Sequence, residues 1–232
     1  MSSFPLEVLY EDNHCIAVLK PAGVPSTHFQ GTEETIDRAV KEYLKEKHKK
    51  PGNVFLGIVH RLDKPVSGVL LFARTSKAAA RLSEQFRQGT IEKIYWAIVE
   101  GRVQESCGEL KSWLKKDESA GRVIVVAPGT TGGREALLHY ERRASSGGLT
   151  RLEIRPRTGR THQLRVQLSE KGHPIYGDTK YGSRHSFGNA IALHARNLAF
   201  IHPTKGEPVS LTAPLPVSWA ARFRTLLQEV LQ

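Results

Sequence analysis

The chain has 232 residues, of which 39% are hydrophobic and 25% are charged, an ordinary composition for a globular protein. No apolar stretch approaches the roughly 20 residues of a membrane-spanning helix. The 34 lysines and arginines outnumber the 23 acidic residues and give a net charge of +11. This balance favours a polyanionic partner, RNA or DNA, with a merely solvated basic surface as the alternative.

The N-terminus and the cysteines bear on the compartment. The first residues lack the basic and apolar regions of a secretion signal. Cys15 and Cys107 are the only cysteines, too few for a disulfide framework or a cysteine zinc site. We expect a cytoplasmic protein. We expect no metal, because none of the ten histidines falls in an H-x-H or H-E-x-x-H spacing.

The first part of the chain alternates strands and helices. Apolar residues recur with helical spacing between residues 36 and 44, and Gly89 is well placed to stop a second helix that Thr75 or Ser76 can cap. The predicted elements are strands over 6–10 and 15–19, a helix from 35 to about 47, a strand over 69–73 and a helix from 75 or 76 to 89.

Strands dominate the second part of the chain. The pattern predicts strands over 94–99, 122–127, 137–142, 149–155 and 191–201, and helices over 161–171 and 217–231, with surface loops at 115–120 and 130–133. Short turns and irregularly placed helices indicate an α+β fold on a mixed, largely antiparallel β-sheet with flanking helices. With no internal repeat or linker, residues 1–232 are expected to form a single domain.

The most informative segment is His60-Arg61-Leu62-Asp63, which precedes the buried strand 69–73. Pro65 and Gly68 are typical turn residues between the two. A carboxylate held rigidly at the edge of a core, with cations at hand, suits covalent catalysis. Asp63 is therefore a candidate nucleophile, and an ordinary turn begun by an aspartate is the alternative.

A second segment, residues 155–165, is rich in arginine. Arg155, Arg157 and Arg160 crowd a glycine-containing loop, and Arg165 lies one turn into the helix that follows. Guanidinium groups beside a helix N-terminus can hold a phosphate or a carboxylate. The alternative is a helix with scattered exposed arginines.

Together these segments resemble the RluA-type family of pseudouridine synthases. The resemblance extends in order from residue 20 to about 203. It rests on K-P-x-G at 20–23, H-R-L-D with S-G at 60–68, the tyrosine segment 93–97, the arginine run 157–165, G-H-P-I with G-D at 172–178, and the segments 193–195 and 202–203. Val66 departs from the family pattern, which usually has threonine there.

The resemblance implies that the protein isomerises a specific uridine in structured RNA, ribosomal or transfer, to pseudouridine. Asp63 would be the nucleophile and Arg165 would pair with it. Tyr95 would lie against the uracil face, where stacking is worth about 1–3 kcal/mol, and its hydroxyl would assist proton removal. Without the resemblance, Tyr95 would be a core aromatic residue.

The resemblance implies further substrate contacts. Arg61 would enter the RNA as the target base leaves the stack, Leu164 would line the pocket wall, and Arg160 would bind substrate. Neither cofactor nor metal is implied. The expected protein is a monomer with no protein partner, no membrane association and no N-terminal S4-type RNA-binding module.

Two other functions are weighed against this one. A catalytically silent RNA-binding protein on the same fold would not need Asp63, Tyr95 and Arg165 together. A metal-dependent nuclease would require clustered carboxylates that the sequence does not show.

Overall fold

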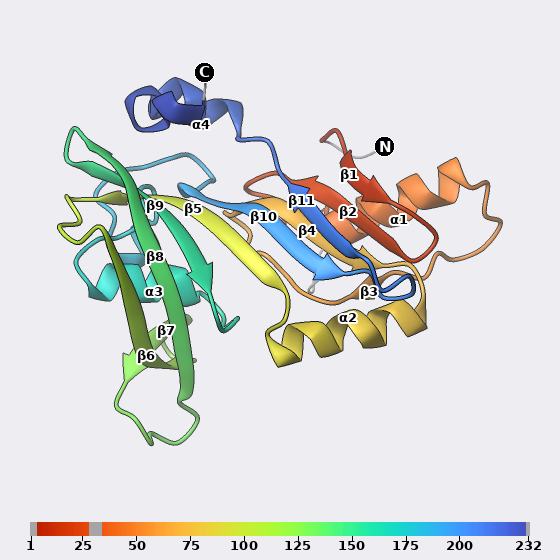
Figure 1. Ribbon diagram of the computed structural model, residues 1–232, viewed down its shortest axis with the longest axis horizontal. Coiled ribbons are helices and arrows are strands. Elements are labelled where there is room, and N and C mark those ends of the chain that lie inside the picture. The colour runs from red at the N-terminus through yellow and green to blue at the C-terminus, as the bar shows by residue number, and fades with distance from the viewer. Residues whose placement is uncertain (1–3, 28–33, 231–232) are drawn as a thin grey trace. The chain divides into compact units, whose positions relative to one another are not determined.

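The computed structural model describes residues 4–27 and 34–230. The chain forms two compact units, coloured by residue number in Figure 1. Unit 1 comprises residues 1–93 and 195–214, and unit 2 comprises residues 94–194 and 215–232. Each unit is therefore built from two segments of the chain.

The sheet of unit 1 centres on β4 (Ser67–Ala73), in which every residue is buried. Its strands follow the order β1-β2-β4-β10, with β3 paired to β4 and β11 paired to β10. The other strands of this sheet are β1 (Glu7–Glu11), β2 (Cys15–Lys20), β3 (Gly57–Ile58), β10 (Leu193–Ile201) and β11 (Pro208–Thr212). The pairs β1–β2, β2–β4, β3–β4 and β10–β11 are antiparallel.

Two helices belong to unit 1, α1 (Ile36–Lys47) and α2 (Ser76–Gln88). The Oγ1 of Thr75 accepts a hydrogen bond of 3.1 Å from the backbone N–H of Ala78 and so caps α2. Gly89 ends the helix in the left-handed conformation that glycine adopts without strain. α2 packs against β3 and β4, and its Leu82 is fully buried in the core.

The sheet of unit 2 has the order β5-β9-β8-β6-β7, and neighbouring strands are antiparallel. These strands are β5 (Glu92–Glu100), β6 (Cys107–Asp117), β7 (Arg122–Val126), β8 (Arg134–Ser146) and β9 (Leu149–Pro156). The helix α3 (Gln163–Glu170) packs on β6 and β7. Its Val166 shares a small core with Leu114, Val123 and Ala136.

Three short helices complete unit 2, namely the 3₁₀-helix η1 (Thr179–Tyr181), α4 (Val217–Arg222) and the 3₁₀-helix η2 (Arg224–Val230). Across residues 4–27 and 34–230, none of the helices has the length and apolar character needed to cross a bilayer.

The predicted α+β class is confirmed, but several elements differ from the prediction. The strands β3, β6 and β11 were not predicted, and β6 continues to Asp117 through the first part of the expected 115–120 loop. The lysine-rich sequence of β6 hides its alternation, in which Leu110 and Leu114 are the buried positions.

The closing helix predicted over 217–231 is wrong. The α-helix ends at Arg222, and Phe223 leaves the helical conformation with φ −121° and ψ 30°. The Phe223 ring packs edge-on against the rings of Tyr176 and Trp219. The chain then continues as η2. The packing of the Phe223 ring therefore replaces the apolar face of the single long helix that the sequence predicts.

Gly68 was expected in a turn and lies inside β4 instead. Its φ of +124° is one that residues with a side chain rarely adopt. A Cβ at this position would lie 2.3 Å from the carbonyl oxygen of Ala195 in β10. Glycine thus allows the backbones of β4 and β10 to approach closely.

Candidate active site

Asp63 lies on a tight turn that leads into β4. Its carbonyl oxygen accepts a 3.0 Å hydrogen bond from the backbone N–H of Val66. Val66 is buried, and the bond that it makes to the turn comes from its main chain. Any residue other than proline can supply this bond, so valine in place of the family's threonine leaves the turn closed.

The K-P-x-G segment supports this turn from the side. The carbonyl oxygen of Lys64 accepts hydrogen bonds from the backbone N–H of Gly23, at 2.8 Å, and from the Nζ of Lys20, at 3.0 Å. Lys20 ends β2, which pairs with β4. The residue that follows Asp63 is thus tied to the neighbouring strand.

Lys20 places a cation close to the candidate nucleophile. Its side chain is fully buried, and its Nζ also donates to the carbonyl oxygens of Pro21, at 2.9 Å, and Val24, at 2.6 Å. Burial lowers the pKa of the Lys20 ammonium to about 7, while the negative charge of Asp63 acts in the opposite direction. Arg61, the cation considered from the sequence, is exposed.

His60, the first residue of the H-R-L-D motif, is held in place by contacts of its uncharged ring. Its Nε2 accepts a 2.9 Å hydrogen bond from the backbone N–H of Leu71, and its ring stacks on Phe86 with centroids 4.7 Å apart. Burial, with a smaller contribution from Lys93, lowers the pKa of His60 to about 3. A neutral imidazole with the proton on Nδ1 satisfies this arrangement.

Arg165 of α3 forms a buried ion pair within unit 2. Its Nε and Nη2 donate to the two carboxylate oxygens of Asp178 at 2.6 Å and 2.8 Å. The two side chains are 6% and 1% exposed. The guanidinium also lies 5.0 Å from the ring centroid of Tyr181. A bidentate pair over an aromatic ring fixes both the position and the plane of the guanidinium.

Gln163 and His162 organise the loop before α3. The Gln163 Oε1 accepts from the backbone N–H of Arg160 at 3.1 Å and from the hydroxyl of Thr158 at 2.7 Å. His162 adopts a left-handed conformation with φ 53°, and its Nδ1 lies 2.7 Å from the hydroxyl of Tyr181. The same Tyr181 side chain thus contacts both His162 and Arg165.

The arginines proposed as an anion cradle have different surroundings. Arg160 is exposed, and its Nε donates to the carbonyl oxygen of Glu135 at 3.0 Å. Arg155 forms ion pairs with Glu141 and Glu153 on the sheet. Arg165 is paired with Asp178. Two of these arginines therefore already have carboxylate partners inside the protein.

The other two predicted site residues of unit 2 are Tyr95 and Leu164. Tyr95 is half-buried on β5 opposite Ile154 of β9, and Leu164 is buried on α3. Arg61 and Asp63 belong to unit 1, whereas Tyr95, Arg160, Leu164 and Arg165 belong to unit 2. The predicted roles of these residues, including the Arg165–Asp63 pair, stay predictions.

Two contributors were named in motifs without a role. Asp178 follows a glycine and carries no distinctive local pattern, although an isolated acid beside a basic loop is a weak signal for an ion pair. Lys20 lies at the end of an apolar strand, and a lysine continuing such a strand is a signal for a buried ammonium.

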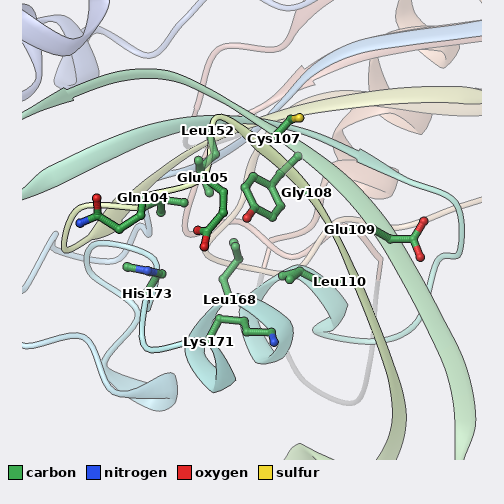
Figure 2. A pocket seen from close by; sticks show the side chains of 12 residues that line it. Gln104, Glu105, Cys107, Gly108, Glu109, Leu110, Leu152, Leu168, Lys171 and His173 are labelled. Carbon is green, nitrogen blue, oxygen red and sulfur yellow. The ribbon is translucent and has the colours of Figure 1, made fainter.

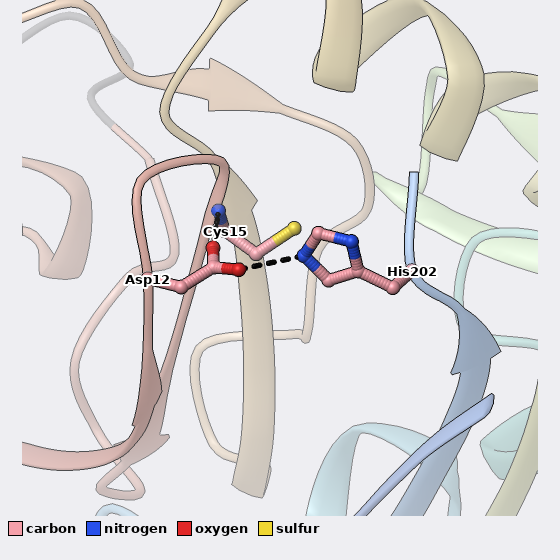
Figure 3. A group of neighbouring side chains, drawn as sticks. All are labelled: Asp12, Cys15 and His202. Carbon is pink, nitrogen blue, oxygen red and sulfur yellow. Dashed lines mark hydrogen bonds and ion pairs between the residues drawn. The ribbon is translucent and has the colours of Figure 1, made fainter. Parts of the chain in front are cut away.

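Among the described residues, Asp12, Cys15 and His202 form a cluster of metal-ligating side chains, of which only His202 belongs to a family motif (Figure 3). The His202 Nε2 donates to the Asp12 carboxylate at 2.7 Å, and its Nδ1 accepts from the backbone N–H of Lys205 at 3.0 Å. Burial raises the pKa of the Cys15 thiol to about 12. Both ring nitrogens of His202 are therefore engaged in hydrogen bonds within the protein.

Unit 2 also contains a pocket of about 490 Å³, lined from β6, β8, β9 and α3 (Figure 2). Its lining includes the buried Leu110, Leu152 and Leu168 and the exposed Glu105 and Lys171. None of the predicted site residues lines it. The pocket is therefore separate from the residues that the sequence singles out.

Comparison with known proteins places these features in a family. Residues 14–170 match the RNA pseudouridylate synthase family. The ribosomal large subunit pseudouridine synthase D of Zymomonas mobilis is 34% identical over 96% of this chain and 73% of its own length. The tRNA pseudouridine synthase C of Haemophilus ducreyi is 36% identical over 94% of each chain.

A solved structure agrees with the sequence match. The human RNA pseudouridylate synthase domain containing 4 superimposes with a TM-score of 0.79 and 26% identity, over 95% of this chain and 92% of that chain. The matched region includes the braced turn at Asp63 and the first turn of α3 with Arg165. The chain therefore belongs to the RNA pseudouridylate synthase family.

Proposed function

We propose that the protein converts a specific uridine of a ribosomal or transfer RNA to pseudouridine, with Asp63 as the nucleophile. The observation that carries this proposal is the turn at Asp63. Hydrogen bonds hold the residues beside the carboxylate, and a buried ammonium contributes to its electrostatic surroundings. A positioned carboxylate of this kind suits covalent catalysis.

In the proposed reaction, a carboxylate oxygen of Asp63 bonds to C1′ of the uridine as the N1–C1′ bond breaks. The departing uracil spreads its negative charge over its carbonyl groups, so a second carboxylate is not needed to protonate it. The C5 atom of the ring then bonds to C1′ and displaces Asp63. The proton on C5 leaves and N1 gains a proton, so the product is an isomer of the substrate.

The other site residues receive roles by the same proposal. Arg165 orients the carboxylate of Asp63. Tyr95 lies against the face of the uracil ring, and Leu164 lines the wall of the pocket that holds the ring. Arg61 and Arg160 bind the RNA. The curated relatives include both ribosomal and transfer RNA enzymes by name, which supports the substrate class without favouring either RNA. We also propose a cytoplasmic enzyme that acts as a monomer in a single catalytic domain.

Tritium release tests the proposal. RNA transcripts that carry uridine tritiated at C5 lose the label when C5 bonds to C1′. Transcripts of ribosomal and transfer RNA are incubated with wild-type protein and with Asp63→Asn. We expect release by the wild type on one class of RNA and none by Asp63→Asn.

RNA affinity is the control for this experiment. Asp63→Asn removes a negative charge from a site that faces a polyanion, so its RNA affinity should equal or exceed that of the wild type. Substantial tritium release by Asp63→Asn would refute the nucleophile. An inactive wild type that binds RNA tightly would instead favour the silent RNA-binding protein.

A further inference from the structure

Ser26 makes an unusual pair of hydrogen bonds to one residue. Its hydroxyl donates to the carbonyl oxygen of Leu62 at 2.6 Å and accepts from the backbone N–H of the same Leu62 at 3.0 Å. Ser26 is 4% exposed and Leu62 is 7% exposed. A single hydroxyl thus satisfies both main-chain polar groups of the residue that precedes Asp63.

These two main-chain groups need a partner because they are removed from water. A buried N–H or C=O left without a hydrogen bond costs about 1–3 kcal/mol. Leu62 lies outside the named helices and strands. Strand pairing does not supply its hydrogen bonds, and the Ser26 hydroxyl does so in its place.

The Ser26 contact complements the one made by Lys20 and Gly23. Those two residues hold the carbonyl oxygen of Lys64, on the far side of Asp63. The segment 20–26 therefore holds the chain one residue before and one residue after the candidate nucleophile. The peptide before Asp63 is held at the Leu62 carbonyl by Ser26, and the peptide after it is held at the Asp63 carbonyl by the N–H of Val66. Both peptides that flank Asp63 are therefore held, which fixes the direction in which its side chain leaves the backbone.

We propose that Ser26 is a positioning residue that sets the reactive position of Asp63 through the main chain of Leu62. This inference rests on the proposed function, in which Asp63 is the nucleophile. Ser26 acts through Leu62 rather than on the RNA. Loss of its hydroxyl should therefore slow the chemical step and leave RNA binding unchanged.

The test compares Ser26→Ala, Ser26→Val and Ser26→Thr. Threonine and valine have nearly the same shape, but only threonine keeps the hydroxyl. Single-turnover rates of tritium release are measured at saturating RNA, and the dissociation constant for RNA is measured separately. A displacement of the order of 1 Å at a reacting group can cost about 100-fold in rate.

We expect Ser26→Ala and Ser26→Val to slow the chemical step by about 10- to 100-fold. Their RNA dissociation constants should stay within about twofold of the wild-type value, because no RNA contact is lost. Ser26→Thr should restore most of the rate. Stability alone would not separate the threonine and valine variants in this way when both are assayed well below their melting temperatures.

Thr75→Ala provides a matched control. It also removes a hydroxyl that accepts from a backbone N–H in unit 1, at the start of α2, but it leaves the Asp63 turn untouched. Its melting temperature should fall while its single-turnover rate stays at the wild-type value.

Three outcomes would overturn the inference. Folded Ser26→Ala and Ser26→Val with wild-type rates would show that Asp63 needs no help from Ser26, while an inactive Asp63→Asn would leave the proposed function intact. Loss of RNA affinity in place of rate would make Ser26 a binding residue. Failure of both hydroxyl-free variants to fold would make Ser26 a general structural residue.

Discussion

The two units hold their candidate functional side chains in different ways. In unit 1, Asp63 is positioned through nearby main-chain groups. Their carbonyl oxygens accept hydrogen bonds from Lys20, Gly23 and Ser26, and the N–H of Leu62 donates to Ser26. In unit 2, Arg165 is positioned through its own guanidinium, which Asp178 grips at two nitrogens.

The difference follows from the hydrogen-bonding groups that a carboxylate and a guanidinium have. Hydrogen bonds to the main chain fix the position of Asp63 without using the acceptor capacity of its carboxylate. A guanidinium has five N–H donors and can give two of them to a structural partner. The main-chain hydrogen bonds around Asp63 and the ion pair of Arg165 therefore act on different parts of the two residues.

Substitution of Arg165 is expected to have the largest effect. Arg165→Ala should reduce activity by well over 100-fold, because it removes the cation proposed to orient Asp63 and leaves the carboxylate of Asp178 buried without a charge partner. Such a loss typically costs about 3–5 kcal/mol of unfolding free energy. Arg165→Lys should lose less activity, because lysine keeps the charge and lacks only the planar fork.

Single-turnover rates and urea unfolding measure the two effects separately. Wild-type activity in both variants would show that Arg165 does not orient Asp63. Equal losses in both would assign the effect to the planar fork rather than to the charge.

The variant Asp178→Asn changes the other member of the Arg165–Asp178 ion pair. It keeps the size of the side chain but removes the charge that holds the guanidinium, so the unfolding free energy should fall by about 3 kcal/mol. Asp117→Asn is the control, because Asp117 is a carboxylate of the same unit that accepts its hydrogen bonds at the surface. It should leave stability nearly unchanged. A wild-type rate in Asp178→Asn would show that Arg165 needs no side-chain support.

Acid should destabilise unit 1 at the end of β4 remote from Asp63. There Glu11 forms ion pairs with Arg74, Lys47 and His48. Burial raises the pKa of Glu11, but hydrogen bonds from Lys47, His48 and Tyr43 outweigh it and lower the pKa from 4.5 to about 2. The folded state therefore gains stability above pH 4.5 and loses it as the pH falls from about 4.5 to 2.

The loss should amount to at most about 3 kcal/mol. Urea unfolding at pH 7 and pH 3 measures it, and Glu11→Gln supplies the control because it removes the titrating group. The pH dependence over this interval should be smaller in Glu11→Gln. An unchanged pH profile would assign the acid sensitivity to other carboxylates.

The smallest expected effect concerns Arg61. This exposed residue lies two positions before Asp63. We expect both side chains to project to the same side of the chain, as they do in an extended segment. Its cation can fill the gap left by an extruded base and offset an unstacking cost of a few kcal/mol. Arg61→Ala should therefore slow modification of a uridine stacked in a structured loop more than that of the same uridine in a flexible strand. An equal fractional loss on matched RNAs would assign Arg61 to general affinity.

The motifs indicate the candidate catalytic residues better than the residues that support them. Asp63 and Arg165 were predicted because each lies beside turn residues or in a local run of distinctive residues, whereas Lys20 was named only as part of the K-P-x-G motif. The pairing of Arg165 with Asp178 was not predicted, because Asp178 is 13 positions away and only the fold brings the two together. Ser26 was missed for the same reason, since its contact with Leu62 spans 36 positions.

The secondary structure shows a similar division. Strands with a continuous apolar run, such as β2 and β5, were predicted because burial is visible in the residue pattern. The strands β11 and the lysine-rich β6 form because they pair with β10 and β8. No residue pattern within β11 or β6 indicates this pairing.

The division of unit 1 into two chain segments has a consequence for biosynthesis. β4 pairs on one side with β2, which is made before it, and on the other with β10, which emerges from the ribosome only after residues 94–194. At about 5–20 residues per second, this delay lasts roughly 5–20 s. Throughout that time β4, whose residues are all buried in the folded protein, can pair with β2 and the two-residue β3 but lacks β10. The nascent chain is therefore most exposed to aggregation before β10 is translated.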